Sequence, residues 1–181
     1  MEMSVNLTKL QTEIERTCFL KNPVKISNGK YVTNYIDLYR LTCQPTWMNL
    51  ITSELRSRIF EQGWDYKYVA GKELHGSLLA SHMNCNNLIV RKHVTNLDVV
   101  DKFNQVVTPY NVVTGTKVIL VDDVSSAGIN MSDSIEKLSH NFDVVGAISV
   151  ICRGSGALEV SDKWDIPFEY LLYIPEEYMY G

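Results

Sequence analysis

Apolar and polar residues alternate along the chain in two rhythms, one typical of helices and one typical of buried strands. Helical spacing of apolar residues predicts helices over 5–16, 45–60, 78–83 and 131–138. Short apolar runs predict strands over 66–70, 87–92, 118–121, 142–151 and 164–174. Strands that alternate with helices predict an α/β fold: a mostly parallel, twisted sheet with helices on both faces.

The stretch before the second helix has a different pattern. Residues 19–38 hold β-prone runs on either side of Asn28–Gly29, and this dipeptide between two such runs predicts a β-hairpin. Local physics explains it as a purely structural hairpin.

The chemistry of the chain is concentrated after the apolar run 118–121. Asp122 and Asp123 follow where this strand is expected to end, and a small, hydroxyl-rich turn leads from them into a helix. Backbone N–H groups of such a turn converge on one point, where the helix dipole favours an anion. Carboxylates beside a bound phosphate would repel it, so we assign them to sugar hydroxyls or to a hydrated Mg²⁺. The simpler alternative is an ordinary strand-to-helix connection with a Ser or Asp N-cap.

Composition narrows the class of protein. The chain has 181 residues, of which 45% are hydrophobic and 21% charged, values typical of a single globular domain. A net charge of −4 argues against general nucleic-acid binding. Its four cysteines are dispersed without a CxxC pair, and we find no signal peptide or long apolar run. We therefore expect a cytoplasmic protein with reduced thiols and no membrane association.

The segment 118–130 resembles the phosphoribosyl pyrophosphate (PRPP) signature of type I phosphoribosyltransferases, in which four apolar residues precede Asp–Asp and a Ser/Thr-rich, Gly-containing loop. The resemblance implies that Asp122 and Asp123 are catalytic residues that face the ribose hydroxyls. It implies that the following loop wraps the 5′-phosphate through Ser125, Ser126, Ala127, Gly128, Ile129 and Asn130. It also implies Mg²⁺ held mainly by PRPP rather than by the protein, and a homodimer.

Two further segments match the pyrophosphate side of the same family. Gly71, Lys72, His75 and Gly76 stand in a Gly-bounded loop after a predicted strand, which resembles the family's pyrophosphate-binding element. Arg91–Lys92 matches the Arg–Lys pair that orotate phosphoribosyltransferases have before their mobile lid. The resemblance implies that these cations bind pyrophosphate oxygens, with Lys92 also catalytic, and that the lid spans 93–116.

The N-terminal region, about 17–40, resembles the hood of orotate phosphoribosyltransferases, and the core would then span about 41–175. Tyr35 stands where that family stacks an aromatic residue on the base. Two alignments place the family's base-contacting lysine at Ser27 or at Lys25. Arg153 stands where the family pairs an arginine with the orotate carboxylate. We add Ser126 to this base-binding set.

The lid departs from the family pattern. The lysine that the family uses there falls at Thr95 and its histidine at Leu97, so that only His93 and Lys102 could substitute.

Three hypotheses follow. The leading one is a pentosyltransferase of pyrimidine nucleotide synthesis that moves ribose 5-phosphate from PRPP to a nucleobase, orotate first, with another pyrimidine or a purine left open. The second, favoured by the divergent lid, is a non-catalytic PRPP-binding regulator. The third is an unrelated phosphate-binding α/β domain.

Overall fold

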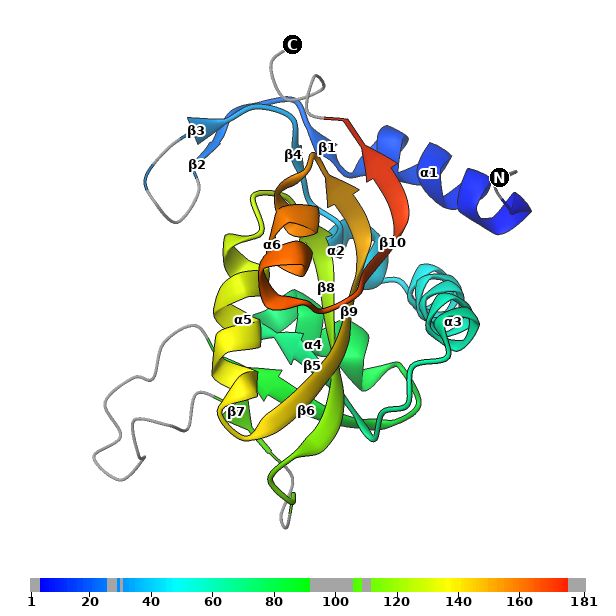
Figure 1. The fold of residues 1–181 in the computed structure, drawn as a ribbon. Coiled ribbons are helices and arrows are strands. Elements are labelled where there is room, and N and C mark those ends of the chain that lie inside the picture. Colours follow the sequence, from blue (N-terminus) through cyan, green and yellow to red (C-terminus); the bar gives the residue numbers. More distant parts are fainter. Residues whose placement is uncertain (1–3, 26–28, 30, 92–105, 109–111, 176–181) are drawn as a thin grey trace.

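The computed structural model describes residues 4–25, 29, 31–91, 106–108 and 112–175, drawn as the coloured ribbon in Figure 1. Its central sheet has six strands in the spatial order β10-β9-β8-β5-β6-β7. These strands are β5 (Tyr68–Lys72), β6 (Asn86–Val90), β7 (Val106–Val107), β8 (Thr116–Ser125), β9 (Phe142–Arg153) and β10 (Phe168–Ile174). Neighbouring strands are parallel except for β6 and β7, which are antiparallel. The predicted fold class is therefore confirmed.

Helices cover both faces of this sheet. They are α1 (Val5–Thr17), α2 (Tyr39–Thr42), α3 (Pro45–Gln62), α4 (Glu73–Ser81), α5 (Ile129–Ser139) and α6 (Gly156–Trp164). Successive residues of a strand point to opposite faces, so Val69 and Ile119 pack in one apolar cluster with α1, α3 and α4. Their neighbours Ala70 and Leu120 pack in a second cluster with α5. Both faces are buried, which explains the nearly continuous apolar runs of the sequence.

The strand order reverses between β5 and β8. From β5 the chain goes outward to β6 and then crosses back to β8 on the other side of β5. In open α/β sheets, ligands bind beyond the carboxyl ends of the strands at such a switch point. The topology alone therefore directs attention to the ends of β5 and β8.

A small antiparallel layer precedes the sheet in the chain. The strand β1 (Phe19–Leu20) pairs with β4 (Tyr35–Ile36), and β2 (Val24–Lys25) pairs with β3 (Tyr31–Val32). The hairpin expected around Asn28–Gly29 is present as the β2–β3 pair. In Figure 1 the arrowheads of β9 and β10 point toward this layer, which therefore lies beyond the carboxyl ends of those strands.

Three expectations about element boundaries were wrong. Strand β8 does not end before the acidic pair but runs through Ser125, because the long strand β9 pairs with it as far as Cys152. Residues 73–77 are not a loop: α4 begins directly after β5, through Glu73 at φ 46°. Residues 156–164 form α6, which the sequence pattern did not predict, and the last strand begins only at Phe168.

Several predicted features lie outside the described residues. They are Ser27, Lys92 and most of the predicted lid, including His93, Thr95, Leu97 and Lys102. Within the described part of the chain, no helix has the length and apolar character needed to cross a bilayer.

Candidate active site

The candidate site is built where the carboxyl ends of β5 and β8 lie side by side. Asp122 and Asp123 are the seventh and eighth residues of β8, and His75 stands in the first turn of α4, just after β5. The Nδ1 atom of His75 lies 3.0 Å from Oδ2 of Asp123. This pair joins the two segments that the sequence assigned to the ribose and to the pyrophosphate.

The pKa values of the two adjacent carboxyl groups are shifted in opposite directions. Burial, reinforced by the negative charge of Asp123, raises the pKa of Asp122 well above its ordinary value. Burial would also raise the pKa of Asp123, but the hydrogen bond and the charge of His75 lower it below its ordinary value. In return, the hydrogen bond to Asp123 raises the pKa of His75. The site therefore favours negative charge on Asp123 and positive charge on His75, and it disfavours a charge on Asp122.

Aromatic side chains from the N-terminal region face this ion pair. The ring of Tyr39 stacks on the imidazole of His75, with the centroids 5.5 Å apart and the planes 13° from parallel. Burial and the charges of Asp123 and Asp37 raise the pKa of Tyr35, so this tyrosine of β4 lies within electrostatic reach of the acidic pair. The sequence singled out Tyr35 but missed Tyr39, which has no local pattern to mark it.

The loop between β8 and α5 is the segment for which the sequence predicts an anion cup. Gly128 precedes α5 with φ 71°, and no side chain caps the first N–H groups of the helix. A Cβ added at Gly128 would overlap the carbonyl oxygen of Gly156, and one at Gly156 would lie 2.5 Å from the carbonyl oxygen of Ser126. The loop is thus held tightly against the start of α6. The buried Oγ of Ser125 has no hydrogen-bond partner in the described structure, so it is available to a ligand.

A second pair of glycines shapes the turn on the pyrophosphate side. A Cβ at Gly71 would overlap the carbonyl oxygen of Gly76, and one at Gly76 would lie 2.9 Å from the carbonyl oxygen of Val121. The turn from β5 into α4 therefore packs directly against β8. Glycine is required at these positions because two backbone segments approach each other closely.

Lys72 has a different environment from the one expected of it. Its side chain is buried, and its Nζ donates to Oδ2 of Asp133 at 2.6 Å and to Oδ1 of Asn130 at 3.3 Å. Two residues predicted to bind PRPP, Lys72 and Asn130, are therefore bonded to each other. Asp133 was missed, although its i,i+4 spacing to Lys137 was a visible signal.

The remaining predicted residues differ in burial. Arg153 is buried at the end of β9, where its Nη1 donates to the carbonyl oxygen of Asn34 at 2.9 Å. This bond ties the sheet to the turn that precedes Tyr35. Arg91 directly follows β6 and is exposed, as are Lys25 on β2 and Ser126, Ala127 and Ile129 of the cup.

The potential metal-binding side chains at the site suit a metal ion that is held mainly by the substrate and not by the protein alone. Among the described residues, no group of three or more His, Cys, Asp or Glu side chains is placed to hold a metal ion. Asp123, whose pKa is lowered, stands two residues before Ser125, where the predicted anion cup begins. Mg²⁺ commonly binds one or two carboxylates together with substrate phosphates and water, so the residues present fit Mg²⁺ that arrives with a phosphorylated ligand.

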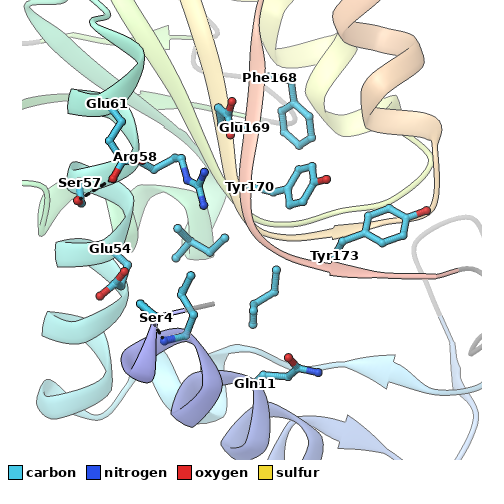
Figure 2. A pocket seen from close by; sticks show the side chains of 13 residues that line it. Ser4, Gln11, Glu54, Ser57, Arg58, Glu61, Phe168, Glu169, Tyr170 and Tyr173 are labelled. Atoms are coloured by element: carbon cyan, nitrogen blue, oxygen red, sulfur yellow. Dashed lines mark hydrogen bonds between the residues drawn. The ribbon is translucent and has the colours of Figure 1, made fainter. Parts of the chain in front are cut away.

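A cavity of about 780 Å³ lies elsewhere, between α1, α3 and the edge strand β10. Figure 2 shows Arg58 extending from α3 toward Tyr170 of β10, with Glu54 and Glu61 on the same helix. None of the predicted site residues lines this cavity.

The arrangement of the sheet, its flanking helices and the N-terminal layer is the type I phosphoribosyltransferase fold. No family model matches the sequence. Solved structures of this fold superpose on most of the chain. One is Mycobacterium tuberculosis orotate phosphoribosyltransferase in complex with inorganic phosphate, with a TM-score of 0.75 and 22% sequence identity. The match covers 94% of this chain and 96% of that one. *Trypanosoma brucei* adenine phosphoribosyltransferase has a TM-score of 0.69 at 16% identity, covering 94% of this chain and 81% of that one.

The curated relatives share one enzyme name and are therefore more specific than the fold. Orotate phosphoribosyltransferase of *Pyrococcus horikoshii* is 29% identical over 172 residues, covering 90% of this chain and 88% of the relative. The *Corynebacterium glutamicum* protein of the same name is 28% identical over 166 residues, covering 88% and 86%. The resemblance to orotate phosphoribosyltransferases expected from the sequence motifs is therefore confirmed over most of the chain.

Proposed function

We propose that the protein is an orotate phosphoribosyltransferase, a pentosyltransferase that converts PRPP and orotate to orotidine 5′-monophosphate and pyrophosphate in pyrimidine nucleotide synthesis. The observation that carries this proposal is the ion pair between His75 and Asp123, which joins the expected pyrophosphate turn to the expected ribose carboxylates at the switch point of the sheet. The named relatives support the same reaction, and one solved neighbour of similar fold, from *M. tuberculosis*, was determined with PRPP.

The 5′-phosphate of PRPP would bind in the cup before α5. Its oxygens would accept hydrogen bonds from the uncapped N–H groups that follow Gly128 and from the buried hydroxyl of Ser125. The positive end of the α5 dipole favours a dianion at this point. The cup thereby fixes one end of the substrate.

The ribose would lie over the acidic pair. Asp123, held ionised by His75, would accept hydrogen bonds from the ribose hydroxyls and favour the positive charge that develops on the sugar as pyrophosphate departs. Asp122 keeps its proton more readily and can therefore donate a hydrogen bond as well as accept one. Mg²⁺, when bound with PRPP, would supply Lewis-acid stabilisation of the leaving pyrophosphate.

The pyrophosphate would lie over the turn from β5 into α4. The imidazolium of His75 and the exposed guanidinium of Arg91 would face its oxygens, next to the backbone between Gly71 and Gly76. Lys72 could join them only by leaving Asp133. Lys92 is the remaining cation of the predicted set.

The base would lie between the N-terminal layer and the sheet. We propose that Tyr35 stacks on the ring and that Arg153 pairs with the carboxylate of orotate, with Lys25 and Ser126 as further contacts. The bond from Arg153 to the carbonyl of Asn34 supports this arrangement, since it connects the arginine to the turn that carries Tyr35. We also propose a Mg²⁺ requirement, a homodimer and a cytoplasmic location, on the basis of the family resemblance.

The second candidate is a protein that binds PRPP without turnover. It is favoured by the lid sequence, in which Thr95 and Leu97 replace the lysine and histidine of the family pattern.

One experiment separates these functions. PRPP and Mg²⁺ are mixed with the protein and with orotate, uracil, adenine or hypoxanthine in turn, and released pyrophosphate is measured. We expect pyrophosphate release with orotate and with none of the other three bases. Pyrophosphate release with another base would show that this base, and not orotate, is the substrate. PRPP binding measured by calorimetry, without pyrophosphate release, would favour the non-catalytic regulator. Absence of PRPP binding would leave only an unrelated phosphate-binding domain.

A further inference from the structure

Asp133, on the second turn of α5, bonds two lysines from different parts of the chain. Its Oδ2 accepts from Nζ of Lys72 at 2.6 Å and from Nζ of Lys137 at 2.9 Å. The lysine side chains are only 8% and 14% exposed, against 37% for Asp133. Burial would raise the pKa of Asp133, but its hydrogen bonds to the two ammonium groups lower it.

Each lysine also has a second partner. Nζ of Lys72 lies 3.3 Å from both the side-chain and the backbone oxygen of Asn130. Nζ of Lys137 donates to the carbonyl oxygen of Arg91 at 3.0 Å. We call this set, Lys72, Asn130, Asp133, Lys137 and the carbonyl of Arg91, the Asp133 bridge. It connects the end of β5, the residue after β6 and the first turns of α5.

These segments carry the groups that would hold the two charged ends of PRPP. Lys72 is the last residue of β5 and stands three residues before His75, while Asn130 belongs to the anion cup. The distance between the cup and the pyrophosphate turn must match the span of PRPP from its 5′-phosphate to its pyrophosphate. A side-chain bridge between them therefore bears on the geometry of substrate binding.

Stability alone is a weak explanation for a bridge of this kind. Withdrawing two ammonium groups from water has a large desolvation cost, and well-packed apolar residues often serve stability as well or better. The exposed ion pair between Lys117 and Asp65, with side chains 48% and 86% exposed, has no such cost and no connection to the site. The buried bridge is the one that lies between the substrate-binding segments.

We propose that Asp133 is a positioning residue for PRPP: through Lys72 and Lys137 it fixes the anion cup relative to the pyrophosphate turn and to Arg91. This inference rests on the proposed function, because it takes PRPP as the ligand that spans these segments. Asp133 itself does not touch the substrate. Its loss should therefore affect PRPP much more than orotate.

The test compares Asp133→Asn with Asp65→Asn, a charge removal of the same kind at the exposed ion pair. We expect Asp133→Asn to raise KM for PRPP about tenfold, because misplacement of the two anion-binding segments weakens binding of the ligand that spans them. KM for orotate should stay within about twofold of the wild-type value, and Asp133→Glu should recover part of the loss. Asp65→Asn should leave both constants unchanged.

A double variant covers the case in which Asp133→Asn does not fold. Lys72→Met together with Asp133→Leu replaces this pair by apolar side chains, while Nζ of Lys137 keeps the carbonyl oxygen of Arg91 as a partner, so the variant should keep the fold. Because it lacks the bridge to Asn130, we expect the same rise in KM for PRPP. A folded variant of either kind with the wild-type KM for PRPP would overturn the proposal, as would an equal rise of KM for both substrates.

The proposed function can be wrong while the positioning role of Asp133 still holds. If the wild-type protein binds PRPP without releasing pyrophosphate, the dissociation constant of PRPP from calorimetry replaces KM in the same comparison. A wild-type protein that does not bind PRPP at all would overturn both proposals.

Discussion

The cavity beside β10 and the carboxyl end of the sheet differ in the side chains that they bring together. The cavity between α1, α3 and β10 has a volume of about 780 Å³. Side chains of ordinary helix and strand surfaces line most of it (Figure 2). Among them are Ser57 and Glu61 of α3, which are hydrogen-bonded to each other one helical turn apart. The carboxyl end of the sheet has instead the partly buried ion pair of His75 with Asp123, whose side chains are 34% and 18% exposed.

The backbone differs between the two regions as well. At the sheet end, Gly71 packs on Gly76 and Gly128 packs on Gly156, and Glu73 has a left-handed conformation that a residue with a side chain rarely adopts. Such features persist only where the surrounding structure enforces them, and they cluster at functional sites. From this comparison we expect charge pairs and close backbone contacts at a topological switch point to be a better guide to the functional site than the volume of a cavity.

The largest effect should come from Asp123→Asn. This change removes the ionised acceptor for the ribose hydroxyls and the partner of His75, so we expect kcat/KM for PRPP to fall about 10²–10³-fold. Steady-state kinetics with pyrophosphate detection measures it. Asp143→Asn, on an exposed residue near the other end of the sheet, is the control and should change nothing. A loss below about fivefold at Asp123 would remove the functional distinction between the carboxyl end of the sheet and the cavity beside β10.

The sequence was sufficient to predict the strands and helices whose apolar residues are buried. Residues 118–121 and 142–151 are fully or largely buried in adjacent strands, as their apolar runs indicated. Helix α6 was missed because Ala157 is its only buried residue, which leaves little helical pattern to detect. The strand end at Asp122 was wrong because the length of β8 depends on its pairing with β9, a contact between distant parts of the chain.

The same limit applies to the candidate site. The acidic pair, the predicted anion cup and the predicted pyrophosphate turn each have a local motif, so the sequence alone could single out each of them as a segment. The ion pair of His75 with Asp123 and the bond from Lys72 to Asp133 join residues 48 and 61 positions apart. Which side chains meet across such separations is decided by strand order, which no local spacing encodes.

A smaller effect should appear in the pH dependence of stability. The pKa of His75 is raised above 6.5 in the folded protein, so its contribution is fully present below pH 6.5 and is lost as the pH rises through the raised value. The pKa of Asp123 is lowered below 3.8, so its contribution is present above pH 3.8 and is lost as the pH falls through the lowered value. The ion pair therefore stabilises the fold most between pH 3.8 and 6.5.

His75→Gln tests this window. Its melting temperature should fall furthest below that of the wild-type protein at weakly acidic pH, and the difference should shrink as the pH rises through the raised pKa of His75, where the wild-type imidazole loses its charge. A difference that does not vary with pH would mean that His75 contributes through packing on Tyr39 alone.

The smallest effects should come from the cavity beside β10. Arg58 and Glu169 line it, but none of the predicted site residues does, so Arg58→Gln and Glu169→Gln should leave KM and kcat within about twofold of wild type. The free energy of unfolding should change by no more than about 0.5 kcal/mol, the usual range for surface substitutions. Kinetics and urea unfolding measure the two quantities. A change of KM for PRPP above about fivefold in either variant would mean that this cavity is coupled to the carboxyl end of the sheet, since neither side chain lines the site itself.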